Sequence, residues 1–315
     1  MSENKDMKVW GGEVLPANNL PIAEIICGMS EKDYHADKSR MSKHMLERFA
    51  ENPWKYFTMM DNQDKVEEAE TPSMLFGRVA HAITLTPERF AYEYAVQPNT
   101  IKRRAGKAWD EFREANPDKT IVTQDALDKA SAIAAAVRAN HEADTLLGFC
   151  NLREVTVHWE HPRHRGVLLK SRLDAMSNEG RIIVDLKTCC DASADAFIKE
   201  ADTFGYDVQA AMYIDAAAVA GKDPKEFVFI CVEKTFPFAI GIYRFTRYSD
   251  FVQAGRVGYR DMLELFQYQR DCREGGFPVD NYPTKTDLTP AAWSKRYRRY
   301  LESEYATINA NDKLA

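Results

Sequence analysis

The chain has 315 residues, of which 45% are hydrophobic and 29% are charged, an ordinary composition for a globular protein with a large core. No apolar run approaches the roughly 18 residues of a membrane span, and residues 1–12 lack the apolar segment of a secretory signal. The formal net charge of −6 does not exclude a nucleic-acid partner, because such binding depends on local patches of charge. The six scattered cysteines are typical of a reduced, cytoplasmic chain.

The first half of the sequence predicts a loose N-terminal arm followed by helices. Capping residues or prolines precede apolar residues at helical spacing and predict helix starts at Ser42, Pro53, Ser73 and Gln124. The helix from Gln124 should be long and amphipathic. Residues 61–70 read as an acidic loop. Residues 100–120 are basic and polar, which favours a loop with a helical piece.

From Val155 the hydrophobic pattern changes to a period of two, which is typical of strands. Strands are expected over residues 155–159, 167–176, 181–188, 227–232 and 240–245. A helix is expected over residues 210–220, and a long one from Asp250 to about Cys272. This order predicts an α/β fold, in which a central mixed sheet is flanked by helices and carries helical additions at both ends.

Two carboxylates and one amine fall on neighbouring predicted strands. Asp174 lies on one strand, and Asp185 and Lys187 lie two residues apart on the next, so the latter two point to the same face. Asp185 also interrupts an apolar run, where a charge must be paired or bound to a metal. Hard divalent cations prefer oxygen ligands of this kind, and phosphodiester hydrolysis needs such a cation.

Motifs in a defined order resemble the RecB-type branch of the PD-(D/E)xK nucleases. Gly77 to His81 forms a GxxxH element, Asp174 with Asp185–Lys187 forms the D…DxK element, and Gln209 to Tyr213 forms a QxxxY element. Within that branch the chain most resembles the nuclease domains of the exonuclease VIII (RecE) family, from about Tyr34 to Tyr297. The resemblance implies a restriction-endonuclease-like core.

This resemblance also implies a domain organisation. We expect an N-terminal arm over residues 1–30, a single PD-(D/E)xK exonuclease domain over residues 31–300 and a C-terminal tail over residues 301–315.

The same resemblance implies the site residues. The expected metal ligands are His81, Asp174, Asp185 and the carbonyl of Leu186, and the expected catalytic residues are Asp174, Asp185, Lys187, Gln209 and Tyr213. Glu154 is a further candidate, as an outer-sphere or second-metal group. Simpler interpretations stay open at this point. A lone helical histidine is more often a core or surface residue, and Lys187 could be a structural ion-pair partner of Asp185.

Two basic stretches are candidates for contact with DNA. Lys102, Arg103, Arg104 and Lys107 fit a phosphate-contacting loop, with a solvated loop as the alternative. The run Lys295–Arg299 could contact DNA, another subunit or only water. His158, His161 and His164 surround a predicted turn and are expected to be solvated, because no cysteine or carboxylate pattern completes a zinc site. The cysteine spacing predicts no iron–sulfur cluster.

The function that the resemblance implies is exonucleolytic. It implies Mg²⁺, or Mn²⁺ in its place, and 5′ to 3′ digestion of double-stranded DNA ends, which leaves 3′ tails for a RecT-type annealing protein. It also implies a homo-oligomeric ring, with a tetramer favoured, in the cytoplasm of a bacterial host. The sequence lacks GxxxxGK[ST], so activity should not need ATP. The alternatives are a structure-specific or spacer-acquisition endonuclease and a catalytically silent DNA-binding protein.

Overall fold

The computed structural model describes residues 7–10, 13–16, 23–66, 71–164 and 166–282. The chain divides into two compact units, Met1–Val279 and Asp280–Ala315, and the fold below belongs to the first unit. The basic run Lys295–Arg299 and the predicted tail 301–315 lie outside the described residues.

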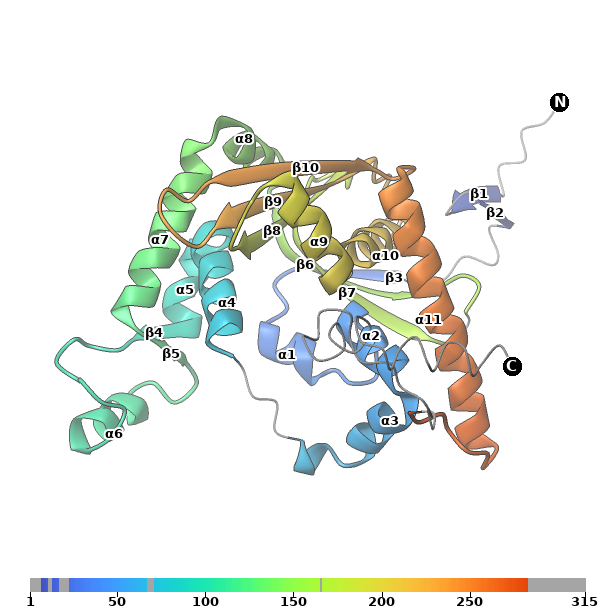
Figure 1. Ribbon diagram of the computed structural model, residues 1–315, viewed down its shortest axis with the longest axis horizontal. Helices are drawn as coiled ribbons and strands as arrows, with labels where there is room; N and C mark the ends of the chain where they lie inside the picture. Colours follow the sequence, from blue (N-terminus) through green and yellow to red (C-terminus); the bar gives the residue numbers. More distant parts are fainter. Residues whose placement is uncertain (1–6, 11–12, 17–22, 67–70, 165, 283–315) are drawn as a thin grey trace, which may run out of the picture. The chain divides into compact units, whose positions relative to one another are not determined.

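Figure 1 shows the strands and helices of the described chain. The strands are β1 (Met7–Trp10), β2 (Glu13–Pro16), β3 (Ala23–Ile26), β4 (Tyr94–Val96), β5 (Thr120–Val122), β6 (Leu152–Glu160), β7 (Leu168–Met176), β8 (Ile182–Cys189), β9 (Glu226–Glu233) and β10 (Ile240–Thr246). The helices are α1 (Glu31–Ala36), α2 (Lys43–Glu51), α3 (Pro53–Asp61), α4 (Pro72–Leu85), α5 (Pro87–Glu93), α6 (Lys107–Glu114), α7 (Gln124–Ala139), α8 (His141–Phe149), α9 (Ala194–Phe204), α10 (Tyr206–Val219) and α11 (Asp250–Glu274).

The central sheet has six strands in the order β10-β9-β8-β7-β6-β3. Only β8 and β9 pair in parallel, and the other neighbours are antiparallel. A parallel pair needs a crossover connection, and α9 and α10 supply it. The predicted mixed sheet with flanking helices is therefore confirmed. The segment predicted as an N-terminal arm contains the edge strand β3. The backbone of this strand pairs with β6 from Ala23↔Trp159 to Ile26↔Thr156, so it is part of the central sheet.

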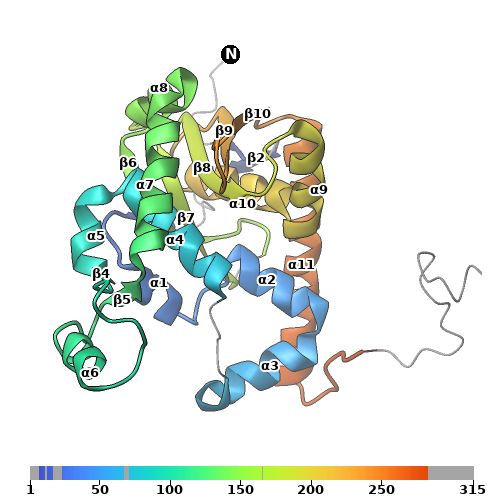
Figure 2. The same cartoon turned by 60° about the vertical axis from the view of Figure 1, so that its left-hand side comes forward.

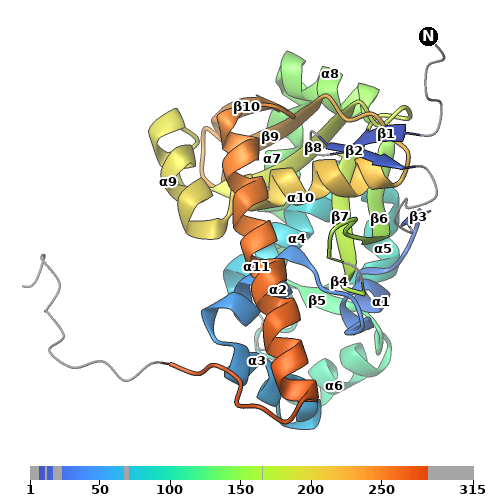
Figure 3. The same cartoon turned by 90° about the vertical axis from the view of Figure 1, so that its right-hand side faces the viewer.

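Each face of the sheet carries its own hydrophobic core. On one face, β9 residues Phe227 and Phe229 pack with side chains from α2, α10 and α11. On the other face, Val228 and Ile230 pack with side chains from α4, α7 and α8. Strand residues alternate between the two faces, as a pleated strand requires. Figure 2 shows α4 and α7 in front of the sheet, and Figure 3 shows α10 and α11 on the opposite side.

Helix α11 holds α10 in place through a close crossing and a buried ion pair. A Cβ at Gly255 would collide with the backbone of Asp207 and Val208, so only glycine permits this approach. One residue further, Arg256 donates to both carboxylate oxygens of Asp215 at 2.9–3.0 Å, and the hydroxyl of Tyr259 donates to the same carboxylate. All three side chains are buried.

Several predicted helix boundaries are confirmed by the capping contacts. The side chains of Ser42 and Thr123 accept hydrogen bonds at the starts of α2 and α7, and Pro53 is the first residue of α3. The helical piece expected within residues 100–120 is α6. None of the helices in the described part of the chain combines the length and apolar character that crossing a bilayer requires.

The prediction of solvated histidines after β6 is wrong for two of them. His161 is 0% exposed and His164 is 6% exposed. The turn folds against α11, so the ring of His161 packs on Tyr259 and on His164, and His164 Nδ1 lies 2.7 Å from Gln267 Oε1. Burial, together with the charges of His164 and Arg260, lowers the pKa of His161 to about 3.

This burial predicts a loss of stability in acid. The unfolded chain protonates His161 near pH 6.5, whereas the folded chain resists protonation until about pH 3. The stabilising contribution is therefore complete above pH 6.5 and is lost as the pH falls toward 3, by at most about 1.4 kcal/mol per pH unit. Urea unfolding from pH 7 to pH 4 should show a shallower decline in His161→Gln than in the parent chain. His44→Gln, at a site with a 74% exposed side chain, should leave the slope unchanged; equal slopes in all three would contradict the prediction.

Candidate active site

The site lies where β7 and β8 separate. These strands pair only at Ala175↔Val184 and Met176↔Ile183. Beyond that point, the side chain of Asp174 takes the place of a backbone partner, and its Oδ2 accepts a hydrogen bond from the amide of Leu186 at 2.8 Å. The split leaves room for side chains between the two strands and brings Asp174 close to the DxK segment.

His81, Glu154 and Asp174 converge on one point from three different elements. Their ligand atoms all lie within 4.8 Å of one another, and His81 Nδ1 lies 3.3 Å from Asp174 Oδ2. Helix α4 delivers His81: it begins at the Thr71 cap and passes β8 near Thr188. A Cβ at Gly77 would meet Thr188 Oγ1 at an ordinary 3.8 Å, so the packing alone does not require this glycine.

Glu154 adopts a strained backbone in the middle of a strand. Its φ is +49°, a conformation that is uncommon for residues other than glycine and often marks functional sites. Its neighbours Arg153 and Val155 pair with Ala175 and Leu173, so Glu154 lies opposite Asp174 in the register. From the sequence, Glu154 was only a candidate for an outer-sphere or second-metal group. The alternating pattern carries no signal for its strained backbone.

Arg172 holds the carboxylate of Glu154. Its Nε donates to Glu154 Oε2 at 2.7 Å, and its Nη1 donates to the carbonyl of Met29 at 3.0 Å. The guanidinium carbon also lies 5.8 Å from the ring centre of Tyr34 in α1. Sequence reasoning missed Arg172, although its position two residues before Asp174 on the same strand places both side chains on one face.

Asp185, Lys187 and Gln209 form a second group beside the first. Lys187 Nζ lies 2.7 Å from Asp185 Oδ2 and 2.9 Å from Gln209 Oε1, and the amide of Gln209 donates to Asp185 Oδ1. The lysine ammonium also lies 4.9 Å from the ring centre of Tyr206. Gln209 and Tyr213 both belong to α10, and Tyr213 packs on Phe227 at 6.2 Å between ring centres.

The predicted site residues therefore fall into two adjacent sets. His81 and Asp174 belong to one set, which Glu154 joins, while Asp185 belongs to the set with Lys187 and Gln209. The contact of Leu186 with the first set is made by its amide N–H, and its carbonyl as a metal ligand stays a prediction. The donor chemistry fits a divalent cation, because one imidazole and two carboxylates meet at one point. Asp185 Oδ2 is buried and is paired with the ammonium of Lys187 at 2.7 Å.

Burial dominates the electrostatics of both sets. It raises the pKa of Asp174 to about 7, an effect that His81 opposes and the charges of Asp185 and Glu154 reinforce. For Lys187, burial alone would lower the pKa, but Asp185 and Asp174 outweigh it and raise the value. Lys187 therefore stays protonated at neutral pH and can only donate. Burial also raises the pKa of Tyr213, whose hydroxyl is hydrogen-bonded to the backbone of Arg172.

The first set opens into a cleft of about 360 Å³. Besides His81, Glu154 and Asp174, its lining includes three arginines, Arg78, Arg89 and Arg172. Each arginine pairs with a glutamate that also lines the cleft: Arg78 with Glu31 at 2.9 Å, Arg89 with Glu93 at 2.6 Å, and Arg172 with Glu154 at 2.7 Å. The cleft thus combines cation ligands with guanidinium groups that suit phosphate oxygens.

The basic loop ahead of α6 lies outside this cleft lining. Arg104 is held to the fold, since it donates to Gln97 Oε1 and to the carbonyl of Ile121 and stacks 5.5 Å from the centre of Trp109. Lys102, Arg103 and Lys107 are solvent-exposed. The assignment of these residues to DNA contact stays a prediction.

Residues 42–275 match the family described as "PDDEXK-like domain of unknown function (DUF3799)". The chain belongs to this family. The matched range contains five of the six strands of the central sheet, both sets of site residues and α11, whereas the edge strand β3 precedes it. The family assignment confirms the PD-(D/E)xK part of the predicted resemblance, while the RecE type is a narrower statement. No curated protein sequence matches the chain significantly.

One solved structure supports the fold. A protein from Eubacterium rectale described as a "Putative exonuclease" superposes with a TM-score of 0.55 at 16% identity, over 84% of this chain and 97% of that chain. A second structure, SSO0001, matches with a TM-score of 0.26 at 14% identity, over 73% of this chain and 91% of that chain, which is too low to support an argument. The first match supports the fold, and the family assignment supports a PDDEXK-like domain.

Proposed function

We propose that this protein is a Mg²⁺-dependent, ATP-independent exonuclease of the RecE type that digests double-stranded DNA from its ends. The observation that carries the proposal is the His81–Glu154–Asp174 cluster beside the Asp185–Lys187–Gln209 network, in a chain of the PDDEXK-like family. Mn²⁺ should substitute for Mg²⁺, since both accept oxygen and imidazole ligands.

The residues divide the work of hydrolysis. His81, Glu154, Asp174 and Asp185 would hold the cation, which when bound polarises the phosphate and lowers the pKa of water. Protonated Lys187 would donate a hydrogen bond to the phosphoryl oxygens, on which negative charge develops. Gln209 fixes the direction of that ammonium, because its oxygen accepts from Lys187 while its amide donates to Asp185.

The finer parts of the proposal are polarity, assembly and partner. We infer 5′ to 3′ digestion that leaves 3′ tails for a RecT-type annealing protein in single-strand-annealing recombination. The enzyme would act as a homo-oligomeric ring in the cytoplasm of a bacterial host that carries phage genes. These inferences are carried over from the RecE family, which the chain resembles through its GxxxH, D…DxK and QxxxY motifs.

The proposal predicts a specific pattern of digestion. Linear duplexes labelled at either the 5′ or the 3′ end of one strand should be degraded with Mg²⁺ alone, with early release of the 5′ label. A covalently closed circle should survive, and chelation should stop all degradation. Cleavage of the circle would instead indicate an endonuclease, and a requirement for ATP would refute the proposal. Binding without hydrolysis under every metal would indicate a catalytically silent DNA-binding protein.

The exposed loop cations should contribute to DNA affinity. With Ca²⁺ in place of Mg²⁺ so that DNA is bound and not cut, Lys102→Ala/Arg103→Ala should weaken binding equally on unrelated sequences. Each lost phosphate contact should reduce the slope of log affinity against log salt by about 0.9. Arg104→Ala is a poor probe, because this side chain also supports β5. An unchanged slope in the double variant would mean that the loop is only solvated.

A further inference from the structure

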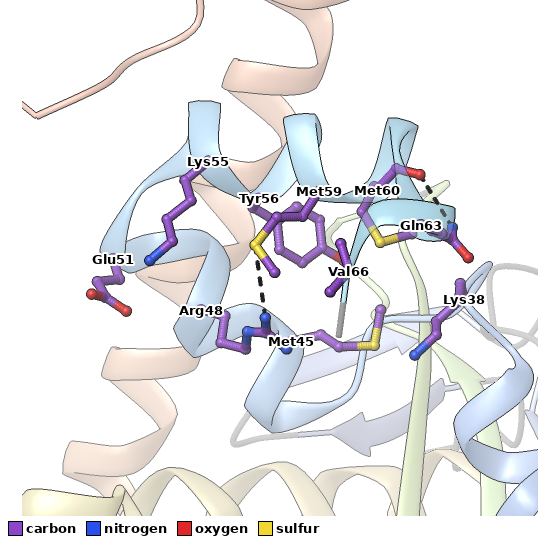
Figure 4. Close-up of a pocket in the computed structure, with 10 residues that line it drawn as sticks. All are labelled: Lys38, Met45, Arg48, Glu51, Lys55, Tyr56, Met59, Met60, Gln63 and Val66. Carbon is purple, nitrogen blue, oxygen red and sulfur yellow. Dashed lines mark hydrogen bonds between the residues drawn. The ribbon is translucent and has the colours of Figure 1, made fainter. Parts of the chain in front are cut away.

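A second cavity, of about 310 Å³, lies between α2 and α3. Its apolar wall consists of three methionines, a tyrosine and a valine: Met45, Tyr56, Met59, Met60 and Val66. Figure 4 shows Met45 of α2 facing Met59 and Met60 of α3 across the opening. The ring of Tyr56 is fixed as part of the wall, because its hydroxyl contacts Met41 Sδ at 3.0 Å.

The rim of this cavity is predominantly cationic. Lys38, Arg48 and Lys55 surround it, and Glu51 is the only acidic residue in its lining. Arg48 lies against the apolar wall, with a guanidinium nitrogen 3.8 Å from Met59 Sδ. A ligand that fits both parts has a flat or compact apolar body attached to a negative charge. A nucleotide has this chemistry, since its base offers a π-face and its phosphate an anion.

The cavity is close to the catalytic centre. Lys43, at the start of α2, donates to the carbonyl of Phe204 at the end of α9. Burial is the main cause that lowers the pKa of Lys43, and the charges of Lys187 and Asp185 also act on it. Arg48, which lines the cavity, lies five residues further along α2, about 7.5 Å at 1.5 Å per residue.

The cavity also neighbours the catalytic cleft across α1. His35 of α1 lines the cleft, and Lys38 lines the cavity three residues later. A DNA strand that leaves the cleft along this side would reach the cavity next.

We propose that this cavity seats an unpaired nucleobase of the DNA strand that occupies the catalytic cleft. The proposal rests on the nuclease function proposed above and adds a binding site to it. Methionine side chains are flexible and polarizable, so a wall made of them accepts bases of different size. That property suits an enzyme that must pass every base. Gln63 also lines the cavity, and its amide donates to the carbonyl of Met60 at 3.2 Å.

The test compares probes that differ only in their bases. With Ca²⁺ in place of Mg²⁺, fluorescence anisotropy would measure binding of a single-stranded thymidine oligonucleotide and of an abasic strand of equal length. The parent protein should bind the thymidine strand about 5- to 100-fold tighter, the range expected for one seated base. Met59→Glu should abolish this preference, and Met59→Leu, which conserves the apolar volume, should keep it.

Two further variants make the result interpretable. Val257→Glu places the same charge on α11 at a residue that is 61% exposed and not part of the cavity, and it should keep the preference. Lys55→Glu changes only the exposed rim, so it cannot disturb the core; it should weaken both strands and keep their ratio. If Met59→Glu unfolds in a thermal scan, Met60→Glu on the same wall replaces it.

The outcomes separate the two proposals. Equal binding of both strands by a parent protein that hydrolyses DNA would overturn the base site alone. A preference for thymidine in a protein that hydrolyses nothing would overturn the exonuclease alone. If Met59→Glu keeps the thymidine preference but disrupts self-association in sedimentation, the cavity is a protein interface and the base site is wrong.

Discussion

Lys187→Ala should reduce the rate of DNA hydrolysis by about 10²-fold or more, the usual loss for a catalytic group, while divalent-metal binding persists. The reason is geometric: Lys187 donates to Gln209 and pairs with Asp185, whereas the atoms of the His81–Glu154–Asp174 cluster do not depend on it. Calorimetric titration with Mn²⁺, run beside an end-labelled digestion assay, measures both quantities on one preparation.

The matched comparison is Asp174→Asn, which conserves shape and removes the charge. This variant should lose both metal affinity and hydrolysis, because Asp174 belongs to the ligand cluster. Asp223→Asn, at an exposed ion pair with Lys225, should behave like the parent chain. The division of roles between Lys187 and Asp174 is wrong if Lys187→Ala loses metal affinity as completely as Asp174→Asn does.

Arg256→Met should lower the free energy of unfolding by about 3–5 kcal/mol, because it leaves a buried carboxylate without its cation. Asp215 is 1% exposed, and in the variant only Tyr259 would still donate to it. Urea denaturation of the parent chain and the variant measures the difference.

An exposed arginine gives the contrast. Arg244 pairs with Glu226 at 2.8 Å on the sheet edge, with a side chain that is 44% exposed, so Arg244→Met should cost at most about 1 kcal/mol. Asp215→Asn/Arg256→Met should be less destabilised than Arg256→Met, since it removes the orphaned charge. Equal losses in the two single arginine variants would show that burial does not govern this pair.

Local patterns were sufficient for the sheet and for part of the site. Alternation or short apolar runs identified β6 to β10, because each of these strands is buried on one face or on both. The isolated charge at Asp185 within an apolar run identified the strand of the candidate site, since a buried carboxylate needs a partner. The partners found are Lys187 and Gln209, and both were predicted as site residues.

Features that depend on contacts between residues distant in sequence could not be predicted from the sequence. The left-handed backbone of Glu154 has no local signal, and its support by Arg172 requires α1 to fold over the sheet. His161 looks solvated in a polar turn, and only its packing on Tyr259, almost 100 residues later, buries it. Both cases involve tertiary contacts that override a local preference.

Helix α11 has a mechanical consequence. It spans about 37 Å in all. Its crossing with α10 at Gly255 lies about 27 Å, at 1.5 Å per residue, from Arg273, which donates to Asp61 at the end of α3. The helix that carries Gln209 and the helix that carries Met59 are thus fastened to one continuous rod. Parts joined in this way cannot open and close independently during a catalytic cycle. In the proposed exonuclease, forward progress along DNA would then come from the strand sliding through a rigid frame, by one step for each released nucleotide.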